Sequence, residues 1–553
     1  MANTTLKFIA AALLALGAAT AAAITASAGS QKFYPDDPMP VERDSQDASG
    51  LKAYDLNLFV DLTYNIIKGG EVLSTSRARN VNTIDEVPDS SWYTNRLGQA
   101  MLTPADMTAG PNTSAGPMPG SWTITSSKSD GVTPGFTVKD AGGQRWFLKF
   151  DPRGYRGMAT GTEVTVTKLM WALGYNVPEN HIAYMTRQQL VVGAEAKYTP
   201  AGGTARAMRP EDVDKLLARA DRELDGRYRV VASKALAGKP VGRIRFAGIR
   251  PDDPNDIVAH EDRRELRGYG VFAAWLNHVD AKAINSLDTL VTENGRSYVK
   301  HHLIDFGSSL GSGGVAPAEY SAGHEYLVEP KLAAKQMFSL GLKPAKWHTM
   351  AFYEAPAIGR MQRNNADFNP ELWKPRVPNQ AFLHARADDK FWAARKLMAM
   401  RTDLIRAAVA AGEFGDPQSE EFLVRALAQR RDAIVRSYLT AVNPIADPQL
   451  DANGQLTFVN AAVDADVARA PQGYRSVWST FDNVMQTADR FGVTTAISTT
   501  IQAPATLPVR EGTYIEVALS AEGGDHTSWE VPVLVYFQRL NGGWRLVGFE
   551  RLP

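Results

Sequence analysis

The hydrophobic pattern of this chain changes twice along its length, and the order of the patterns limits the folds that it can adopt. Short strand-like segments come first, at residues 122–125, 136–139, 146–150, 180–185 and 228–232. Helical spacing dominates from about residue 258 to residue 441, and strand-like alternation returns after Pro444. Strands followed by helices and again by strands predict an α+β fold in which sheets and helices occupy separate regions.

The length of 553 residues is too great for one compact core, and roughly 100–200 residues per domain suggests two to four domains. The pattern places an N-terminal extension at residues 29–115, a strand-rich region at 116–250, a helical region at 251–444 and a small all-β domain at 445–553. We expect the extension, which begins with a polar and proline-rich leader, to pack on the core. No internal repeat is visible.

Composition excludes several classes of function. Hydrophobic residues make up 44% of the chain and charged residues 22%, as in globular proteins. Lys and Arg number 60, and Asp and Glu number 60, so no net charge favours nucleic acid or an anionic membrane as a partner. Cysteine is absent, which rules out disulfides, thiolate zinc sites, iron–sulfur clusters, cysteine nucleophiles and lipoprotein anchors.

The first 28 residues have the pattern of a secretory signal peptide. Lys7 precedes an alanine-rich apolar run at residues 8–24, and Ala26-Ser27-Ala28 forms a small-residue cleavage site. We therefore expect cleavage near Ala28 and an exported protein, periplasmic or secreted, with no stable membrane span after cleavage. The alternative is an uncleaved anchor, although so many alanines make a poor one.

The spacing of apolar residues predicts helices at residues 161–173, 211–224, 260–278, 388–411 and 418–441. The proline-rich stretch at residues 365–380 predicts a loop. In the C-terminal domain, alternation predicts strands at residues 493–502, 514–519, 529–537 and 544–551. The sequence Asn541-Gly542-Gly543 between the last two is typical of a hairpin turn.

Two short motifs stand above this background. Residues 275–285 read WLNHVDAKAIN, in which Asp280 precedes Asn285 by five positions at the end of a predicted helix. Residues 301–307 read HHLIDFG, a short apolar strand that leads into Asp305. Phosphoryl transfer from ATP requires a carboxylate that takes a proton from the acceptor hydroxyl, together with an Asn and a second Asp that hold magnesium.

Each motif alone also fits an ordinary turn, at the end of a helix for Asp280 and at the end of a strand for Asp305. The motifs occur in the order that the chemistry requires, and a possible hairpin at residues 287–299 separates them. This combination favours the catalytic interpretation over two unrelated turns.

Residues upstream of the two motifs supply candidates for binding a nucleotide. Lys149 lies within the apolar strand WFLKF, and Glu163 lies in the first turn of the next predicted helix. A lysine in such a strand also occurs at sheet edges, and a first-turn Glu also suits the helix dipole. The loop at residues 126–135, which contains Gly131 and Gly135, either covers phosphates with backbone N–H groups or is an ordinary hairpin loop.

From about residue 116 to residue 440 the chain resembles the protein-kinase-like superfamily, and more its atypical HipA-type and phosphatidylinositol-kinase-like branches than ordinary eukaryotic protein kinases. The resemblance lies in GTEVTVTKLMWALGYNVPENHI at residues 161–182, in NHVDAKAIN, which is also loosely similar to the loop of aminoglycoside phosphotransferases, and in LIDFG. H-R-D, A-P-E and a glycine triplet are missing, and Lys282 stands where the HipA-type loop has His.

The resemblance implies a two-lobed protein-kinase-like fold, with a β-rich small lobe at residues 116–250 and a helical lobe at 251–444, and it implies ATP and Mg²⁺ as cofactors. Asp280 would be the catalytic carboxylate, Asn285 and Asp305 the metal ligands, and Lys149 the nucleotide lysine. Glu163 and Gly131 are the further candidates for the nucleotide site.

We therefore expect an exported kinase-like enzyme that transfers the γ-phosphate of ATP to a hydroxyl of a protein, sugar, lipid or small alcohol. The alternative is a catalytically inactive pseudokinase that serves as an exported scaffold or binding module, because little ATP is expected outside the cytoplasm. A metal hydrolase that uses His278, His301, His302 or His324 with Asp305 is a weaker alternative, since the chain has no H-E-x-x-H motif.

Overall fold

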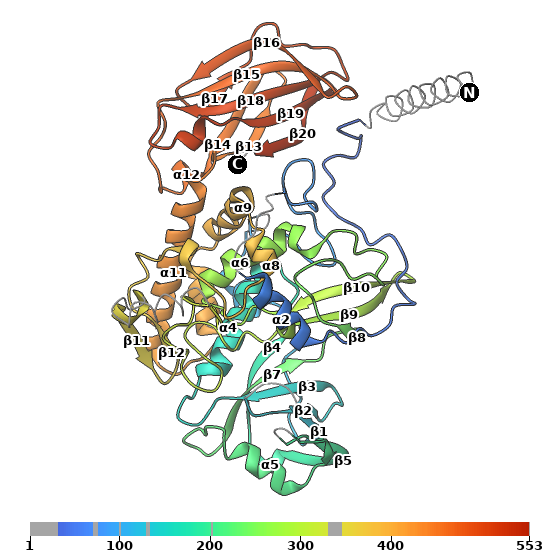
Figure 1. Ribbon diagram of the computed structural model, residues 1–553, viewed down its shortest axis with the longest axis vertical. Coiled ribbons are helices and arrows are strands. Elements are labelled where there is room, and N and C mark those ends of the chain that lie inside the picture. The colour runs from blue at the N-terminus through green and yellow to red at the C-terminus, as the bar shows by residue number, and fades with distance from the viewer. Residues whose placement is uncertain are drawn as a thin grey trace, which may run out of the picture.

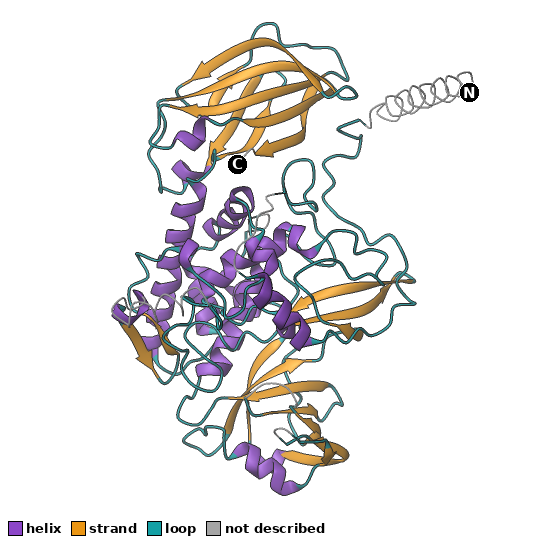
Figure 2. Ribbon diagram, viewed as in Figure 1, coloured by secondary structure: helices purple, strands orange, loops and turns teal. Residues whose placement is uncertain are grey.

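The structure, a computed structural model, describes residues 31–69, 76–98, 101–128, 133–200, 203–329 and 346–551. The predicted signal peptide and Gly131 lie outside these residues. Helices gather in the middle of the molecule, with a seven-stranded sheet at one end and the C-terminal strands at the other (Figures 1 and 2). The predicted division into sheet-rich and helical regions is confirmed.

The seven-stranded sheet has the order β4-β7-β3-β2-β1-β5-β6. Its strands are β1 (Trp122–Ser127), β2 (Gly135–Lys139), β3 (Arg145–Phe150), β4 (Asn180–Met185), β5 (Leu190–Tyr198), β6 (Arg206–Ala207) and β7 (Tyr228–Lys234). Alternate residues of a strand point to opposite faces, so Trp146, Leu148 and Phe150 enter an apolar cluster on one face. Lys149 therefore points to the other face, on which helix α4 (Met158–Ala172) packs.

Helix α4 begins earlier than the apolar spacing predicts. The Asp151 carboxylate accepts hydrogen bonds from the backbone N–H groups of Gly157, Ala159 and Thr160, at 2.8 Å, 2.9 Å and 2.9 Å. These bonds satisfy N–H groups that the first turn of a helix leaves unpaired. Because the capping side chain comes from the end of β3 and not from the position before the helix, the local sequence does not reveal the start.

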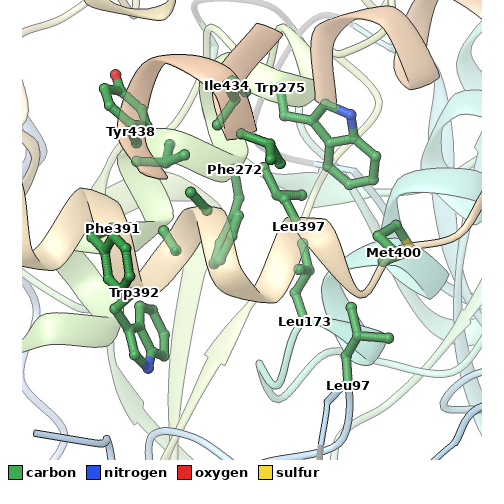
Figure 3. Packing of buried hydrophobic residues seen from close by; sticks show 14 of the residues in the cluster. Leu97, Leu173, Phe272, Trp275, Phe391, Trp392, Leu397, Met400, Ile434 and Tyr438 are labelled. Atoms are coloured by element: carbon green, nitrogen blue, oxygen red, sulfur yellow. The ribbon is translucent and has the colours of Figure 1, made fainter. Parts of the chain in front are cut away.

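Most of the remaining helices form one group around a common core. They are α6 (Arg264–Leu276), α8 (Gln380–Leu383), α9 (Ala387–Met398), α10 (Thr402–Ala410) and α11 (Pro417–Leu439). Figure 3 shows part of this core, to which α6 contributes Phe272 and Trp275, α9 contributes Leu397 and α11 contributes Ile434. Leu97, from the segment before β1, belongs to the same cluster.

Three predicted helices are shorter or divided. The stretch 388–411 consists of α9 and α10 with a break at residues 399–401, and only α5 (Pro210–Leu217) forms in the stretch 211–224. The stretch 260–278 consists of the 3-10 turn η2 (His260–Asp262) and α6, because Arg263 between them is extended. Apolar periodicity continues across such breaks, and the sequence pattern therefore overestimates helix length.

A three-stranded sheet places the two sequence motifs side by side. Its order is β10-β9-β8, with β8 at Lys239–Gly242, β9 at Ser286–Glu293 and β10 at Arg296–Leu303. Asn294 and Gly295 form the turn with φ of 52° and 77°, which confirms the predicted hairpin. Ser286 pairs with Leu303, so the residues just before β9 and just after β10 meet at the same end of the sheet.

The C-terminal region contains two sheets, of order β13-β14-β17 and β16-β15-β18-β19-β20. The strands are β13 (Ile445–Leu450), β14 (Gln455–Asn460), β15 (Gly473–Asp482), β16 (Thr487–Ala496), β17 (Thr500–Gln502), β18 (Tyr514–Glu522), β19 (Val533–Leu540) and β20 (Gly543–Arg551). The predicted turn at Asn541-Gly542 is confirmed by φ of 52° and 72°. The sequence pattern misses β13–β15, and β19 begins late because the 3-10 turn η6 (Thr527–Glu530) precedes it.

Shorter elements elsewhere are β11 (Phe352–Ala355), β12 (Gly359–Gln362), α12 (Ala461–Asp464), η1 (Arg187–Gln189), η3 (Ala283–Asn285), η4 (Lys346–Thr349) and η5 (Pro370–Leu372).

The N-terminal extension contains α2 (Leu58–Lys68) and α3 (Pro104–Ala109), and its first residues contact the C-terminal sheet. Phe33 is buried in a cluster with Phe481 and Tyr536 of the C-terminal sheet. Val41 pairs with Asp89 within the extension itself. The leader therefore also binds the C-terminal sheet, which its polar sequence does not predict. Within the described ranges, no helix combines the length and the apolar composition that crossing a bilayer requires.

Candidate functional site

Lys149 is the centre of a network of ion pairs. Its amine lies 2.9 Å from Glu163 Oε2 and 2.8 Å from Asp305 Oδ1. Burial by itself favours the neutral amine, but the charges of Asp305 and Glu163 outweigh this effect and raise the pKa of Lys149. One lysine therefore connects β3, helix α4 and the turn after β10.

Glu163 contacts both Lys149 and the backbone that follows Asp305. Its carboxylate is 1% exposed, and Oε1 accepts a hydrogen bond of 3.1 Å from the N–H group of Phe306. Asn180 of β4 donates to the same oxygen at 3.4 Å. Because α4 starts at Met158, Glu163 lies beyond the first turn, and the prediction of a first-turn position is wrong. The alternative, in which Glu163 only complements the helix dipole, is wrong for the same reason, because it requires a position in the first turn.

Asp305 occupies a turn whose geometry restricts the residue type. Its φ of 61° lies in the left-handed region, where Asn and Asp are enriched among residues other than glycine. The side chain is 37% exposed, and Lys128 lies 3.9 Å from its second oxygen. Burial would raise the pKa of Asp305, but the charges of Lys149 and Lys128 lower it to about 2. The carboxylate is therefore ionised at neutral pH, as a magnesium ligand must be.

The predicted catalytic loop, by which we mean residues 280–285, is held by hydrogen bonds from Asn285. Its Nδ2 donates to Asp280 Oδ2 at 2.9 Å and to the Asp280 carbonyl at 2.8 Å, so its amide oxygen is directed away from Asp280. The carbonyl of Asn285 accepts a hydrogen bond of 3.0 Å from the N–H group of Ile304. This bond fixes the loop beside the residue that precedes Asp305.

Lys282 places a positive charge beside Asp280. Its amine lies 2.6 Å from Asp280 Oδ1, and both side chains are partly exposed. The backbone of Lys282 is extended, with φ of −145° and ψ of 167°. The sequence did not predict the ion pair between Lys282 and Asp280.

The predicted site residues come together through consecutive contacts. Lys149 contacts Asp305, the residue before Asp305 is bonded to Asn285, and Asn285 is bonded to Asp280. Gly131 lies outside the described residues, but Lys128 at the start of its loop reaches Asp305. An oxygen-rich group of this kind, with Asn285 and Asp305 on adjacent segments, suits a hard divalent cation and the phosphates that accompany it.

Two contributors to the site escape the sequence patterns. Lys128 belongs to a loop whose partner is far along the chain, and Asn180 supports Glu163 from a different strand. Gly307, by contrast, is visible in the sequence as the last residue of the motif D-F-G. A Cβ at this position would lie 3.3 Å from Glu163 Oε2. A side chain at this position would therefore push the buried carboxylate aside by a few tenths of an ångström.

The histidines do not form a metal centre. His301 Nδ1 lies 2.8 Å from Asp288 Oδ1 and its ring stacks on Trp92, while His302 Nδ1 donates to the carbonyl of Leu287. Among the residues that the structure describes, no three His, Asp or Glu side chains are placed to share a metal ion. His301 and His302, two of the ligands considered for a metal hydrolase, therefore have other partners.

No protein-family model matches this sequence, and no curated protein does. Solved structures that are similar include the Helicobacter pylori proinflammatory kinase CtkA, at 12% identity and a TM-score of 0.30, with 56% of this chain and 93% of that chain covered. The Golgi casein kinase with Mn/ADP bound is similar at 10% identity and a TM-score of 0.30, over 72% of this chain and 95% of that one. At this TM-score the assignment of individual site residues depends on the contacts above.

Proposed function

We propose that the protein is a kinase-like phosphotransferase. Residues 116–250 would form the small lobe, residues 251–444 the helical lobe, and residues 445–553 a separate all-β domain. The observation that carries the proposal is the position of the Lys149 amine, within ion-pair distance of both Glu163 and Asp305. A lysine held by a helix carboxylate and placed beside a metal-binding Asp is the arrangement that positions the phosphates of ATP.

Each group has a role that follows from its chemistry. Lys149 and Lys128 bind the phosphates of the substrate ATP, and Glu163 orients Lys149. Asn285 and Asp305 offer amide and carboxylate oxygens, which would hold Mg²⁺. When bound, Mg²⁺ would neutralise phosphate charge as the γ-phosphoryl group is transferred.

Asp280 is the group that takes the proton from the acceptor. As the acceptor oxygen forms its bond to the γ-phosphorus, its O–H bond breaks and the proton passes to the Asp280 carboxylate. The bond from the γ-phosphorus to the β–γ bridging oxygen breaks, and ADP leaves with that electron pair. The hydrogen bond from Asn285 orients the Asp280 carboxylate, and Lys282 places a positive charge where negative charge would otherwise accumulate.

Nucleotide binding is tested first, because it separates a kinase site from a scaffold that has lost it. Millimolar ATP with Mg²⁺ is expected to raise the Tm of the mature protein by about 5 °C, since a ligand that binds only the folded state stabilises it. Asp305→Asn is expected to remove most of this rise. Asp55→Asn, at an exposed position outside the site, is the matched control and is expected to keep it. An unchanged wild-type Tm would favour the exported scaffold.

Phosphate transfer is tested with ATP labelled at the γ-position and an extract of the periplasm or medium as the source of acceptors. Labelling by the wild type and by Asp55→Asn, but not by Asp280→Asn, is the expected result. Equal labelling by all three proteins would contradict the role of Asp280.

We further propose that the protein acts outside the cytoplasm. The pattern of the first 28 residues supports export, and Phe33, shortly after the expected cleavage site, is buried against the C-terminal sheet. N-terminal sequencing of the protein from a periplasmic or culture-medium fraction should find a start near Gly29. A protein retained in the cytoplasm with Met1 intact would contradict export.

A further inference from the structure

A pocket with a volume of about 160 Å³ lies between helix α2 of the N-terminal extension and the catalytic loop. Helix α2, blue in Figure 1, contacts the 3-10 turn η3 of this loop. Lys282 lines the pocket, and its amine lies 2.6 Å from Asp280 Oδ1. The pocket is therefore separated from the proposed proton acceptor by no more than one lysine side chain.

The wall of the pocket is mainly apolar. Leu58 and Leu62 of α2 line it together with Ile284 of the catalytic loop, and all three side chains are partly exposed. Phe246 and Val377, which are buried, extend the apolar part of the wall. Free energy is gained when an apolar group of a ligand removes such a wall from water. The pocket thus offers apolar surface to a ligand.

The polar residues of the lining already have partners within the protein. Asn65 Nδ2 donates to Asp61 Oδ2 at 3.2 Å, and Asp61 Oδ1 pairs with Arg245 at 3.7 Å. Asn379 caps helix α8 through its Oδ1, and its Nδ2 donates to a catalytic-loop carbonyl at 3.2 Å. Lys282 pairs with the proposed proton acceptor. Hydroxyl groups of a ligand would compete with these bonds, and their burial without hydrogen bonds would cost free energy.

The volume of the pocket limits the size of the group that can enter. An apolar cavity of about 150 Å³ holds one benzene molecule. A pocket of about 160 Å³ therefore matches one aliphatic or aromatic side chain of the size of Leu or Phe. It is too small for the acyl chain of a lipid acceptor.

The position of the pocket sets a second requirement. The acceptor must place a hydroxyl group at Asp280 while its apolar group lies in the pocket beyond Lys282. An extended polypeptide meets this requirement, because it rises about 3.3 Å per residue and its alternate side chains point to the same side. A hydroxyl residue and an apolar residue two positions away are then about 7 Å apart.

We propose that this pocket binds an apolar side chain of the phosphate acceptor, and that the acceptor is a polypeptide in which a residue of the size of Leu or Phe flanks the phosphorylated Ser, Thr or Tyr. The identification as acceptor subsite rests on the proposed phosphotransferase function. The O–H bond of the hydroxyl residue breaks, its proton passes to Asp280, and its oxygen bonds to the γ-phosphorus as ADP leaves with the electron pair. Leu62 is on this account a specificity-determining residue and takes no part in the chemical step.

The test supplies the mature protein with Mg²⁺, ATP labelled at the γ-position, and glycine-rich peptides that each contain one Ser, Thr or Tyr. A single Leu is placed in turn at each of the three positions before and after this residue. A matched series carries Asn, which has a similar shape but a polar end. We expect kcat/KM to be at least about tenfold higher for Leu than for Asn at one or more positions, because only Leu gains by entering an apolar pocket.

Variants of Leu62 connect this preference to the pocket. Leu62→Trp fills the pocket from α2 and is expected to reduce the Leu-to-Asn ratio of kcat/KM to about 1. Leu62→Ala widens the pocket and is expected to shift the preference from Leu toward Trp, which checks the site if Leu62→Trp fails to fold. The matched control is Ile67→Ala on the same helix, where the side chain is 79% exposed, and it should keep the wild-type ratio. A ratio unchanged in both Leu62 variants would overturn the proposal.

Recognition is separated from transfer by the same peptides with Ala in place of the hydroxyl residue, whose binding is measured by fluorescence polarisation without nucleotide. Tighter binding of the Leu series, lost in Leu62→Trp, is expected, and equal binding of the two series would overturn the pocket proposal. If this preference is found in a protein that labels no acceptor and whose Tm does not respond to ATP and Mg²⁺, the pocket is retained and the phosphotransferase is defeated.

Two patterns of labelling would retain the phosphotransferase and defeat the acceptor proposal. The first is labelling of peptides with no preference for Leu over Asn at any position. The second is label on a sugar or a lipid but never on a peptide.

Discussion

Lys149 has a structural role besides its proposed role in binding phosphates, because it is the cationic partner of the deeply buried Glu163. The Glu163 carboxylate is 1% exposed, and Lys149 is its one cationic partner among the ion pairs of the described residues. Removal of one member of such a pair leaves an uncompensated charge, which costs more than the pair contributes. The two roles can therefore be separated by changing one residue or both.

Lys149→Met is expected to lower the free energy of unfolding by about 3 kcal/mol, because Glu163 is left unpaired. The double variant Lys149→Met, Glu163→Gln should recover most of this loss, since the buried charge is gone. Neither variant should show a rise in Tm with ATP and Mg²⁺. Urea denaturation and thermal shift measure the two effects. A double variant no more stable than the single one would contradict the charge argument.

His302 makes stability sensitive to acid. Burial lowers its pKa from 6.5 to about 4, so between these values the unfolded chain binds a proton that the folded chain does not. The contribution is fully present above pH 6.5 and is lost as pH falls toward 4. Between pH 7 and pH 5 we expect the wild type to lose about 2 kcal/mol through this residue. Urea denaturation at both pH values should show a smaller loss for His302→Asn; an equal loss would assign the acid sensitivity elsewhere.

At the scale of elements, the β9–β10 hairpin explains why two separate motifs form one site. The pairing of Ser286 with Leu303 brings the residues on either side of the hairpin together, and its turn was visible in the sequence. The start of α4 was not visible, because the cap is Asp151 at the end of β3. An element boundary that depends on a side chain outside the usual capping position cannot be predicted from local pattern.

Helix α4 also carries a glycine whose role depends on its neighbours. An isolated helix gains about 1 kcal/mol when glycine is replaced by alanine. A Cβ at Gly161, however, would lie 2.8 Å from a ring carbon of Phe414 and 2.9 Å from the carbonyl oxygen of Gly412. The helix propensity and the tertiary contact therefore act in opposite directions.

Gly161→Ala is expected to destabilise the protein by about 1–2 kcal/mol, because overpacking against backbone outweighs the gain in helix propensity. The matched control is Gly50→Ala, where a Cβ would meet no atom within 4 Å, and it should change stability by less than about 0.5 kcal/mol. Thermal or urea denaturation decides between them. A stabilised Gly161→Ala would show that α4 is free to move away from Phe414.

At the scale of the whole molecule, the leader joins parts of the chain that are far apart in sequence. Phe33 lies 5.0 Å from the ring of Tyr536 and 6.0 Å from the ring of Phe481, measured between centroids. Lys32 pairs with Glu550 at 3.0 Å. The segment then continues to Val41, which pairs with Asp89 of the same N-terminal extension. The C-terminal strands are therefore attached to the rest of the molecule by the leader as well as by the chain connection between α11 and β13.

Phe33→Ala is expected to destabilise the C-terminal sheet by about 3 kcal/mol, since a buried aromatic ring is lost from a small cluster. Hydrogen exchange should become faster in residues 31–37 and in β15 and β19. Tyr34→Ala changes a neighbouring ring that is 46% exposed and should have little effect. Equal exchange in the wild type and Phe33→Ala would show that the leader does not contribute to holding this sheet.

The sequence alone determined the segregation of strands and helices, the β9–β10 hairpin, and the chemical types at Lys149, Asp280, Asn285 and Asp305. These depend on local periodicity, turn residues and the order of short motifs, all of which lie within a few neighbouring positions. Only the tertiary structure decided that Lys128 reaches Asp305 and that Asp61 of α2 lines a pocket beside the catalytic loop. It also decided that Glu163 lies beyond the first turn of α4, with a buried side chain. Each of these contacts joins segments whose approach depends on packing of the whole core, and no local pattern records that packing.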